Sequence, residues 1–402
     1  MIERTEYLDK LTEYRDMELI KVITGIRRCG KSTLLELYRE RLQASGVLPE
    51  QMISINFEDA DYNDIDDYKA LYSYIKKRLA PDRMNYVFLD EVQHVREFER
   101  AVDSLFIKKN VDLYITGSNS YMLSGEIATL LSGRYVEIKM LPLSFREYVS
   151  NWNENPDLPS RYRDYTQFGS FPYTLKMRGK ADLVREYLNG VYSTVILKDI
   201  VARRNISDVM TLEGVVRYLL DNVGNTCSTK KISDTLTSSG QKTSTHTVEN
   251  YLAGLLDSFA FYRAQRYDVK GRSYLKTGAK YYAVDMGLRY FLLGSKYEDV
   301  GRILENVIYL ELIRRGCDVY VGKVNKYEVD FIAKKGQDTA YYQVASSVRD
   351  AGTLASELRP LESIADHNPK YLITLDNDPP ASHDGIKQIY ALDFLLGRER
   401  RA

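Results

Sequence analysis

The sequence begins to be interpretable at Gly25-Ile26-Arg27-Arg28-Cys29-Gly30-Lys31-Ser32, which matches the phosphate-binding loop pattern G-x-x-x-x-G-K-[ST]. Residues 19–24 before the loop are β-prone, and residues 33–38 after it have apolar residues at helical spacing. Strand, loop and helix in this order predict an α/β nucleotide-binding domain with a parallel sheet. The alternative is a glycine turn that merely precedes a Lys-Ser pair.

The residue types of the loop suit a nucleoside triphosphate with magnesium. Gly25 and Gly30 let backbone N–H groups turn inward, and the helix starting near Lys31 adds its positive end. We predict that Lys31 reaches the β- and γ-phosphates and that the Ser32 hydroxyl ligates Mg²⁺. Arg27 and Arg28 either contact phosphate or a neighbouring subunit, or are solvated. The predicted nucleotide-binding set is Gly25, Ile26, Arg27, Arg28, Cys29, Gly30, Lys31, Ser32 and Thr33.

A second, acidic motif follows the β-prone run 86–89. We predict that Asp90 helps to hold Mg²⁺ and that Glu91 is the general base for the attacking water. A glutamate beside the magnesium aspartate, without an Asn-Lys-x-Asp stretch to read guanine, favours ATP over GTP. The next strand, 111–116, leads to Ser118 and Asn119, of which one is expected to contact the γ-phosphate or the water; turn formation is the alternative.

Arg134 is a further catalytic candidate, which lies between the predicted strand 111–116 and a last predicted strand, 136–140. An arginine can stabilise transition-state charge in its own chain or across a subunit contact. The alternative is a solvated loop arginine.

Composition limits the classes of partner and compartment. The 402 residues are enough for two to four domains, and 56 basic residues balance 56 acidic ones, so no global attraction to polyanions is expected. The three cysteines, Cys29, Cys227 and Cys317, share no metal or disulfide spacing, which favours a reducing cytoplasm. No membrane-length apolar run appears, so no membrane partner is expected.

Residues 207–292 show a different pattern, in which three predicted helices precede two predicted strands, 260–262 and 280–284, that flank a hairpin. This order is typical of a winged helix. Six basic residues and one acid lie between Arg263 and Lys280, which suits contact with a DNA backbone; a solvated hairpin used for protein contacts is the alternative. The candidate nucleic-acid-binding residues are Arg263, Arg266, Lys270, Arg272 and Lys276.

The last segment, 293–402, has carboxylates at the spacing of a restriction-endonuclease-like domain. Glu305 lies on a predicted helix, Glu328 and Asp330 share one face of a strand, and Gln343 lies on the next strand. Nucleases of this type place (Asp/Glu)-x-Lys on that next strand to hold the metal and support the nucleophile. Here the corresponding residues are Gln343, Val344 and Ala345, so the lysine is missing. We expect a scaffold without cleavage; a one-metal site of Glu305 and Asp330 is the alternative.

Over nearly its full length the chain resembles a prokaryotic ATP-binding family that joins an AAA+-like P-loop ATPase to a C-terminal domain of unknown function. The resemblance implies ATP binding, Mg²⁺-dependent hydrolysis, a winged helix and a nuclease-like end. It also makes a homo-oligomer an open possibility, since AAA+-like sites often borrow an arginine from a neighbour. The residues on which the resemblance to this family rests are Gly25–Ser32, Phe88–Glu91, Ile115–Asn119, Leu131–Arg134, Leu141–Phe145, Glu305-Asn306 and Glu328–Phe331.

Taken together, these patterns predict an α/β protein of four parts. They are a P-loop ATPase domain (1–150), a helical lid or linker (151–206), a winged-helix-like module (207–292) and an inactive restriction-endonuclease-like domain (293–402). The predicted function is a cytoplasmic ATPase whose nucleotide state moves the C-terminal module against a partner, with DNA as a candidate. The alternatives are a nucleotide-gated switch with little turnover and an ATP-regulated metal-dependent nuclease.

Overall fold

The computed structural model describes residues 2–120, 131, 133–152, 157–271, 273–294 and 299–398, apart from the side chains of residues 195, 196, 276 and 277. The chain forms two compact units. The first, the nucleotide unit, comprises residues 1–141 with 257–259, and the second unit comprises residues 142–256 with 260–402. The predicted division into four parts stays a prediction. No helix in the described ranges is long and apolar enough to cross a membrane.

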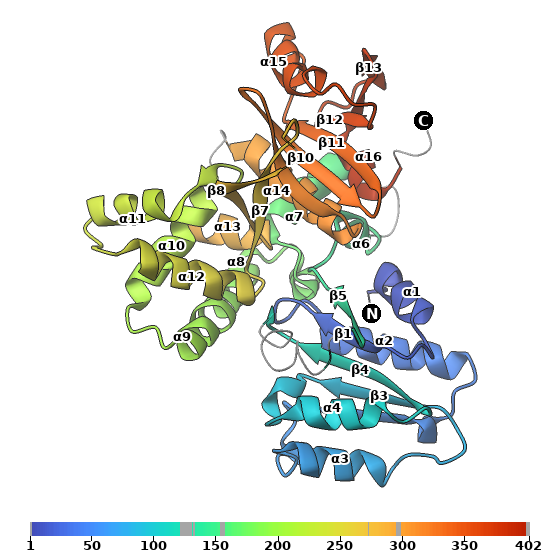
Figure 1. The fold of residues 1–402 in the computed structure, drawn as a ribbon. Coiled ribbons are helices and arrows are strands. Elements are labelled where there is room, and N and C mark those ends of the chain that lie inside the picture. Colours follow the sequence, from blue (N-terminus) through green and yellow to red (C-terminus); the bar gives the residue numbers. More distant parts are fainter. Residues whose placement is uncertain are drawn as a thin grey trace. The chain divides into compact units, whose positions relative to one another are not determined.

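The described strands of the nucleotide unit form a parallel sheet, which agrees with the predicted fold class (Figure 1). Its strands read as nearly continuous apolar runs because helices cover both faces. Their spatial order is β2 (Met52–Asn56), β3 (Asn85–Asp90), β4 (Val111–Gly117), β1 (Ile20–Thr24) and β5 (Tyr135–Lys139).

In the described part of this unit, helices cover both faces of the sheet (Figure 1). On one face, α3 (Tyr68–Lys76) and α4 (Phe98–Phe106) pack their apolar side chains against a cluster of buried Ile, Leu and Val residues from the strands. On the other face lie α1 (Thr5–Glu13) and α2 (Lys31–Ala44), where the Tyr38 ring of α2 contacts Phe88 and Tyr114. Short 3₁₀ turns occur at Pro49–Gln51, Ala60–Tyr62 and Val92–His94.

The parallel pairing has a direct consequence for the predicted site. β1 pairs with β4, and β4 pairs with β3, all in the same direction. Their carboxyl ends therefore meet at one edge of the sheet, which is where ligands bind in open α/β sheets. This edge carries the phosphate-binding loop after β1, the acidic pair after β3 and the polar turn after β4.

Helices make up the first half of the second unit. Within the predicted lid or linker, residues 181–204 form α8, a π-helical segment at Tyr192–Lys198, and α9. The helices of this unit are α6 (Phe145–Val149), α7 (Leu158–Phe168), α8 (Ala181–Val191), α9 (Asp199–Arg204), α10 (Val209–Asp221), α11 (Thr229–Ser238), α12 (Thr245–Asp257), α13 (Met286–Leu293), α14 (Val300–Arg314), α15 (Ala351–Glu362) and α16 (Ala391–Leu396), with a 3₁₀ turn at Pro172–Met177.

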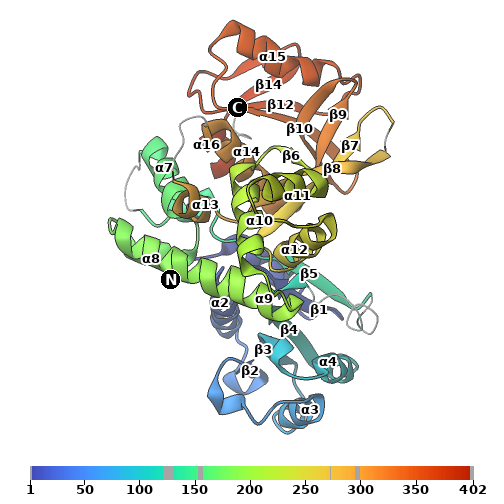
Figure 2. The ribbon, with the colours of Figure 1, turned by 90° about the vertical axis from the view of Figure 1, so that its left-hand side faces the viewer.

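The described strands of the second unit form one mixed sheet (Figure 2). Its spatial order is β13 (Ala381–His383), β14 (Ile386–Tyr390), β12 (Lys370–Thr374), β11 (Asp338–Ala345), β10 (Tyr327–Lys335), β9 (Asp318–Val324), β7 (Phe261–Asp268), β8 (Ser273–Ala283) and β6 (Thr226–Cys227).

The predicted hairpin is longer than expected and is built into this sheet. β7 and β8 pair antiparallel, and β7 also pairs parallel with β9, with Arg266 opposite Val321. The sheet thus runs across the predicted boundary at residues 292 and 293. The element order α10, β6, α11, α12, β7, β8 is the one expected of a winged helix, while the assignment as a winged-helix module stays a prediction.

Candidate nucleotide-binding site

The phosphate-binding loop packs against the segment that leaves β5. Gly25 has φ +154°, and a Cβ on it would lie 2.1 Å from the carbonyl oxygen of Met140. Gly30 has φ +104° and immediately precedes α2, whose first residues are Lys31, Ser32 and Thr33. Both positions thus require glycine, for close approach in one case and for a left-handed backbone in the other.

Lys31 joins the loop to the acidic motif. Its side chain is buried, and the Nζ donates a hydrogen bond to the Gly25 carbonyl at 3.1 Å. The same Nζ forms an ion pair with Glu91 Oε1 at 3.2 Å. The predicted phosphate-contacting lysine and the predicted base therefore touch each other.

Asp90 ends β3 and lies beside two hydroxyl groups. Thr116 Oγ1 donates to Asp90 Oδ1 at 2.5 Å, and the Ser32 side chain is close enough to stabilise the ionised carboxylate. Burial raises the pKa of Asp90, and the bonds from Ser32 and Thr116 oppose this rise. A hydroxyl and a carboxylate side by side fit Mg²⁺, which takes one or two protein ligands when phosphates and water complete its octahedron. Ser32 and Asp90 are therefore the residues suited to hold the metal.

Glu91 is held in place by its backbone and by three side chains. Its φ of +53° is left-handed, and its N–H donates to Thr116 Oγ1 at 2.9 Å. Its carboxylate accepts hydrogen bonds from Ser118 Oγ at 2.9 Å and Gln93 Nε2 at 2.5 Å, in addition to the Lys31 ion pair. Burial alone would raise the pKa of Glu91, but the Lys31 charge and the two hydrogen bonds outweigh it, and the pKa is lowered. Glu91 is thus ionised at neutral pH.

Ser118 and Asn119, the two candidates after β4, are both buried at this edge of the sheet. Ser118 is the one that contacts Glu91 directly. Two further residues of the site were missed from the sequence. Thr116 bridges Asp90 and the Glu91 backbone, and Gln93 binds the Glu91 carboxylate. Their position at or just after a strand end is the only signal that points to them.

Arg134 lies beside the amino-terminal end of β1, whereas the site lies beyond the carboxyl ends of the strands. Its carbonyl accepts a hydrogen bond at 2.8 Å from the N–H of Ile20, the first residue of β1. β1 spans five residues, or about 17 Å at the usual rise per residue, between this point and the loop. The Arg134 guanidinium pairs with Asp103 of α4 instead. A role for Arg134 within its own site is thereby disfavoured, and a role at a neighbouring subunit stays a prediction.

The loop arginines differ in their surroundings. Arg27 forms an ion pair with Glu58 at the surface, with about two fifths of each side chain exposed. Arg28 is exposed and has a left-handed φ of +68°. Contact of either arginine with phosphate stays a prediction.

A buried arginine outside every sequence motif holds the loop. Arg4 Nη1 donates to the Cys29 carbonyl at 3.1 Å, and Nη2 donates to the Leu141 carbonyl at 2.7 Å. The Tyr7 hydroxyl accepts from the Leu141 N–H at 3.1 Å. The amino-terminal segment thus ties the phosphate-binding loop to Leu141, the residue after which the chain enters the second unit.

In the second unit, three of the four predicted nuclease-like residues gather around a lysine. Lys280 Nζ lies within 3.4 Å of carboxylate oxygens of Glu305, Glu328 and Asp330. The fourth, Gln343, accepts a hydrogen bond from the Asp330 N–H at 3.3 Å. Lys280 is one of the six basic residues expected on the surface of the hairpin. Its side chain is instead buried.

The predicted nucleic-acid contacts on the hairpin are not equally placed. Arg263 and Lys270 are exposed, whereas Arg266 is half-buried. Arg272 and the side chain of Lys276 lie outside the described residues. Two of the five candidates are therefore seen on the surface.

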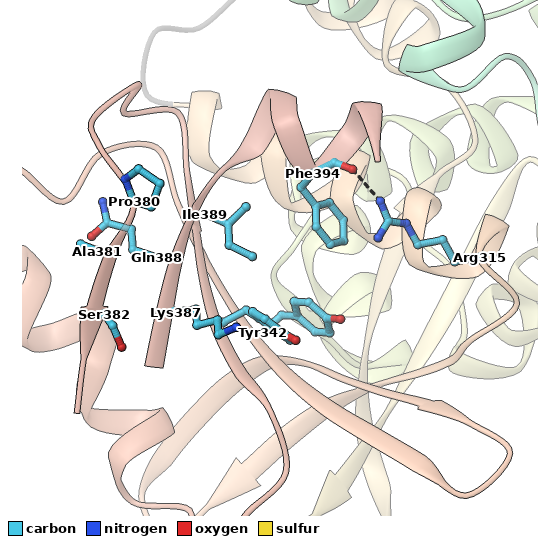
Figure 3. Close-up of a pocket in the computed structure, with 10 residues that line it drawn as sticks. Arg315, Tyr342, Pro380, Ala381, Ser382, Lys387, Gln388, Ile389 and Phe394 are labelled. Carbon is cyan, nitrogen blue, oxygen red and sulfur yellow. Dashed lines mark hydrogen bonds between the residues drawn. The ribbon is translucent and has the colours of Figure 1, made fainter. Parts of the chain in front are cut away.

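An open pocket of about 650 Å³ lies between β11, β12, β14 and α16 of the second unit (Figure 3). Tyr342, Tyr371 and Phe394 line it, and the Tyr342 and Tyr371 rings are stacked at 5.1 Å. The Arg315 guanidinium at its rim lies 4.0 Å from the Phe394 ring centroid and donates to the Phe394 carbonyl at 2.5 Å. The Arg315 guanidinium therefore already has binding partners within the protein.

Comparison with known proteins places these features in a family context. Residues 18–149 match the family of AAA domains, and residues 159–299 match a domain of unknown function. An uncharacterized protein of Haemophilus influenzae is 41% identical over 402 residues, covering 98% of this chain and 99% of the relative. An uncharacterized protein of Methanocaldococcus jannaschii is 30% identical over 342 residues, covering 79% and 74%. A solved Walker-type ATPase of Pyrococcus abyssi, 15% identical, aligns with a TM-score of 0.50 over 73% of this chain and 96% of that one, a likeness of fold.

Proposed function

Because the chain belongs to a family of proteins that join an AAA-type P-loop ATPase domain to a domain of unknown function, we propose that it is a Mg²⁺-dependent ATPase whose nucleotide state moves the second unit against a partner. The observation that carries the proposal is the meeting of Lys31, Asp90 and Glu91 at one edge of the parallel sheet. The family supports nucleotide binding in general, and the contacts of these three residues support hydrolysis in particular.

The contacts suggest an order of events in the site. Phosphate oxygens compete with Glu91 for Lys31, so nucleotide binding draws the ammonium from the carboxylate to the triphosphate. Glu91, ionised and still oriented by Ser118 and Gln93, is then available to polarise a water molecule. When bound by Ser32 and Asp90, Mg²⁺ supplies charge stabilisation at the β- and γ-phosphates.

Binding of a fluorescent ATP analogue and release of phosphate test this assignment. Lys31→Ala should weaken ATP binding by about 10- to 100-fold, because it removes a charge-assisted bond to phosphate. Lys109→Ala, on the surface of the same unit, is the matched control and should bind like wild type. If ATP binding and turnover survive in Lys31→Ala, the loop does not hold the nucleotide.

A second candidate function is a nucleotide-gated switch with slow basal turnover. It is favoured by the three side chains that hold the Glu91 carboxylate. If these contacts restrain the base, Gln93→Ala and Ser118→Ala should raise basal phosphate release several-fold. A fall in turnover at unchanged ATP affinity would show that Gln93 and Ser118 orient the base, and would favour the ATPase.

Duplex DNA is the candidate partner that the exposed bases of the hairpin support. Lys270 and Arg263 are exposed on one hairpin, and backbone phosphates are bound by such residues. Affinity for DNA should fall with rising salt, and Lys270→Ala should reduce the slope of that dependence by about one. Affinity that does not change with ionic strength would exclude phosphate contacts. Measuring phosphate release with and without DNA would show whether DNA stimulates ATP hydrolysis above its basal rate.

A further inference from the structure

Three carboxylates surround one ammonium group in the interior of the second unit. Lys280 Nζ lies 2.9 Å from Glu305 Oε1, 2.9 Å from Glu328 Oε1 and 3.4 Å from Asp330 Oδ1. The Lys280 side chain is only 3% exposed. We call these four residues the Lys280 cluster. Its carboxylates come from α14 and β10, and its cation comes from β8.

The sheet fixes the position of the ammonium group. Lys280 is paired on both sides, with Thr226 of β6 and Ala264 of β7. Other donors satisfy further lone pairs of the carboxylates. The Tyr282 hydroxyl donates to Glu305 Oε1 at 2.7 Å, and the Val344 N–H donates to Asp330 Oδ2 at 2.9 Å. Lys280 is thus an integral member of a hydrogen-bonded network.

A divalent metal does not fit the cluster as it stands. Such an ion needs oxygen ligands at about 2.0–2.6 Å, and the ammonium group occupies the point at which the three carboxylates converge. Within the described residues, no group of three or more His, Cys, Asp or Glu side chains is arranged to hold a metal ion. The strand position where a nuclease has its lysine carries Ala345. Metal-dependent cleavage is therefore not supported by these residues.

We propose that the Lys280 ammonium group is a built-in cation, which takes the place of a divalent metal in the Lys280 cluster and makes the second unit independent of metal ions. Buried carboxylates without a counter-charge are strongly destabilising, so this fold needs one cation here. Lys280 supplies it from within the chain. Removing its charge should therefore turn the cluster into a site that requires a cation from solution.

Thermal unfolding of the full chain, free of nucleotide, tests this idea. Asp90→Asn serves as the background, so that the carboxylate beside the P-loop does not contribute to metal binding. In EDTA, Lys280→Met should unfold roughly 10 °C lower, since one partner of a buried ion pair is lost. Millimolar Mn²⁺ or Ca²⁺ should recover part of this loss and leave the Lys280 parent unchanged. Lys270→Met, an exposed lysine of the same hairpin, is the matched control and should show neither effect.

Neutralising the carboxylates separates this account from a general effect of cations. In Lys280→Met with Glu305→Gln and Asp330→Asn, the recovery by Mn²⁺ should disappear. Lys280→Gln is the milder variant if Lys280→Met does not fold; if neither folds in EDTA, refolding in Mn²⁺ should recover the protein, and failure to do so contradicts the proposal. Saturable Mn²⁺ binding by the Lys280 parent that is lost in Glu305→Gln would overturn it, as would Lys280 variants whose stability does not respond to cations.

Discussion

Gly25 shows at the scale of single residues how closely the phosphate-binding loop is packed. A Cβ there would lie 2.1 Å from the Met140 carbonyl oxygen, and no rotamer can relieve this because the backbone fixes the Cβ position and the oxygen is itself a backbone atom. Gly25→Ala should therefore displace the loop and weaken ATP binding at least tenfold. Gly46 is a suitable control, since its φ of +95° is also left-handed but a Cβ added to it would have no other atom within 4 Å. Equal ATP affinity in the two variants would show that the clash is harmless.

Glu305 is expected to make the stability of the second unit depend on pH. Burial raises the pKa of Glu305, Lys280 opposes the rise and the neighbouring Asp330 adds to it, and the resulting pKa is about 7. Between pH 4.5 and 7 the folded state then binds more protons at Glu305 than the unfolded state, so this contribution to stability is full at low pH and is lost as pH rises towards 7.

Urea unfolding at several pH values measures this effect. The stability attributable to Glu305 should fall by up to about 3 kcal/mol across that interval. Lys280, Asp330 and Tyr282 face the same carboxyl group, Glu328 acts on Asp330, and all four are common to wild type and variant. Glu305→Gln should flatten this part of the pH profile. An unchanged profile would show that Glu305 stays ionised.

The amino-terminal segment is the element that sequence patterns did not connect to the site. Arg4 bonds to Cys29 of the phosphate-binding loop and to Leu141, more than a hundred residues away. Arg4→Ala removes two charge-assisted bonds to buried carbonyl groups and should weaken ATP binding about tenfold or more. Glu3→Ala, on the exposed neighbour, should bind normally. Normal affinity in Arg4→Ala would mean that the loop holds its shape without this clamp.

The elements that could be predicted are those that depend on residues adjacent in the sequence. The strand, loop and helix around Lys31 follow from adjacent residues, as does the strand that ends at Asp90, and both are found where they were expected. The parallel pairing of β7 with β9 joins segments about 55 residues apart, and no local pattern signals it. For the same reason Lys280 read as a surface base of a hairpin, although residues of α14 and β10 surround it. Contacts of this kind depend on tertiary packing.

At the scale of the whole molecule, Arg134 raises the question of assembly. It lies beside the amino-terminal end of β1, whereas Lys31 follows the carboxyl end of that strand. Nearly half of the Arg134 side chain is exposed. If it completes a neighbour's site, phosphate release per protein should rise with protein concentration. Arg134→Ala should abolish this rise without changing ATP affinity. A specific rate that is constant over a wide concentration range would exclude a role for Arg134 in a neighbouring subunit.

We propose above that the nucleotide unit hydrolyses ATP with Glu91 as the general base. Single-turnover phosphate release by wild type and Glu91→Gln, measured beside ATP affinity, tests it most directly. We expect Glu91→Gln to bind ATP at least as tightly as wild type, because Lys31 is freed for the phosphates, and to release phosphate about 100-fold or more slowly. Equal rates of release in the two proteins, or an equal loss of binding and turnover, would show that Glu91 is not the general base.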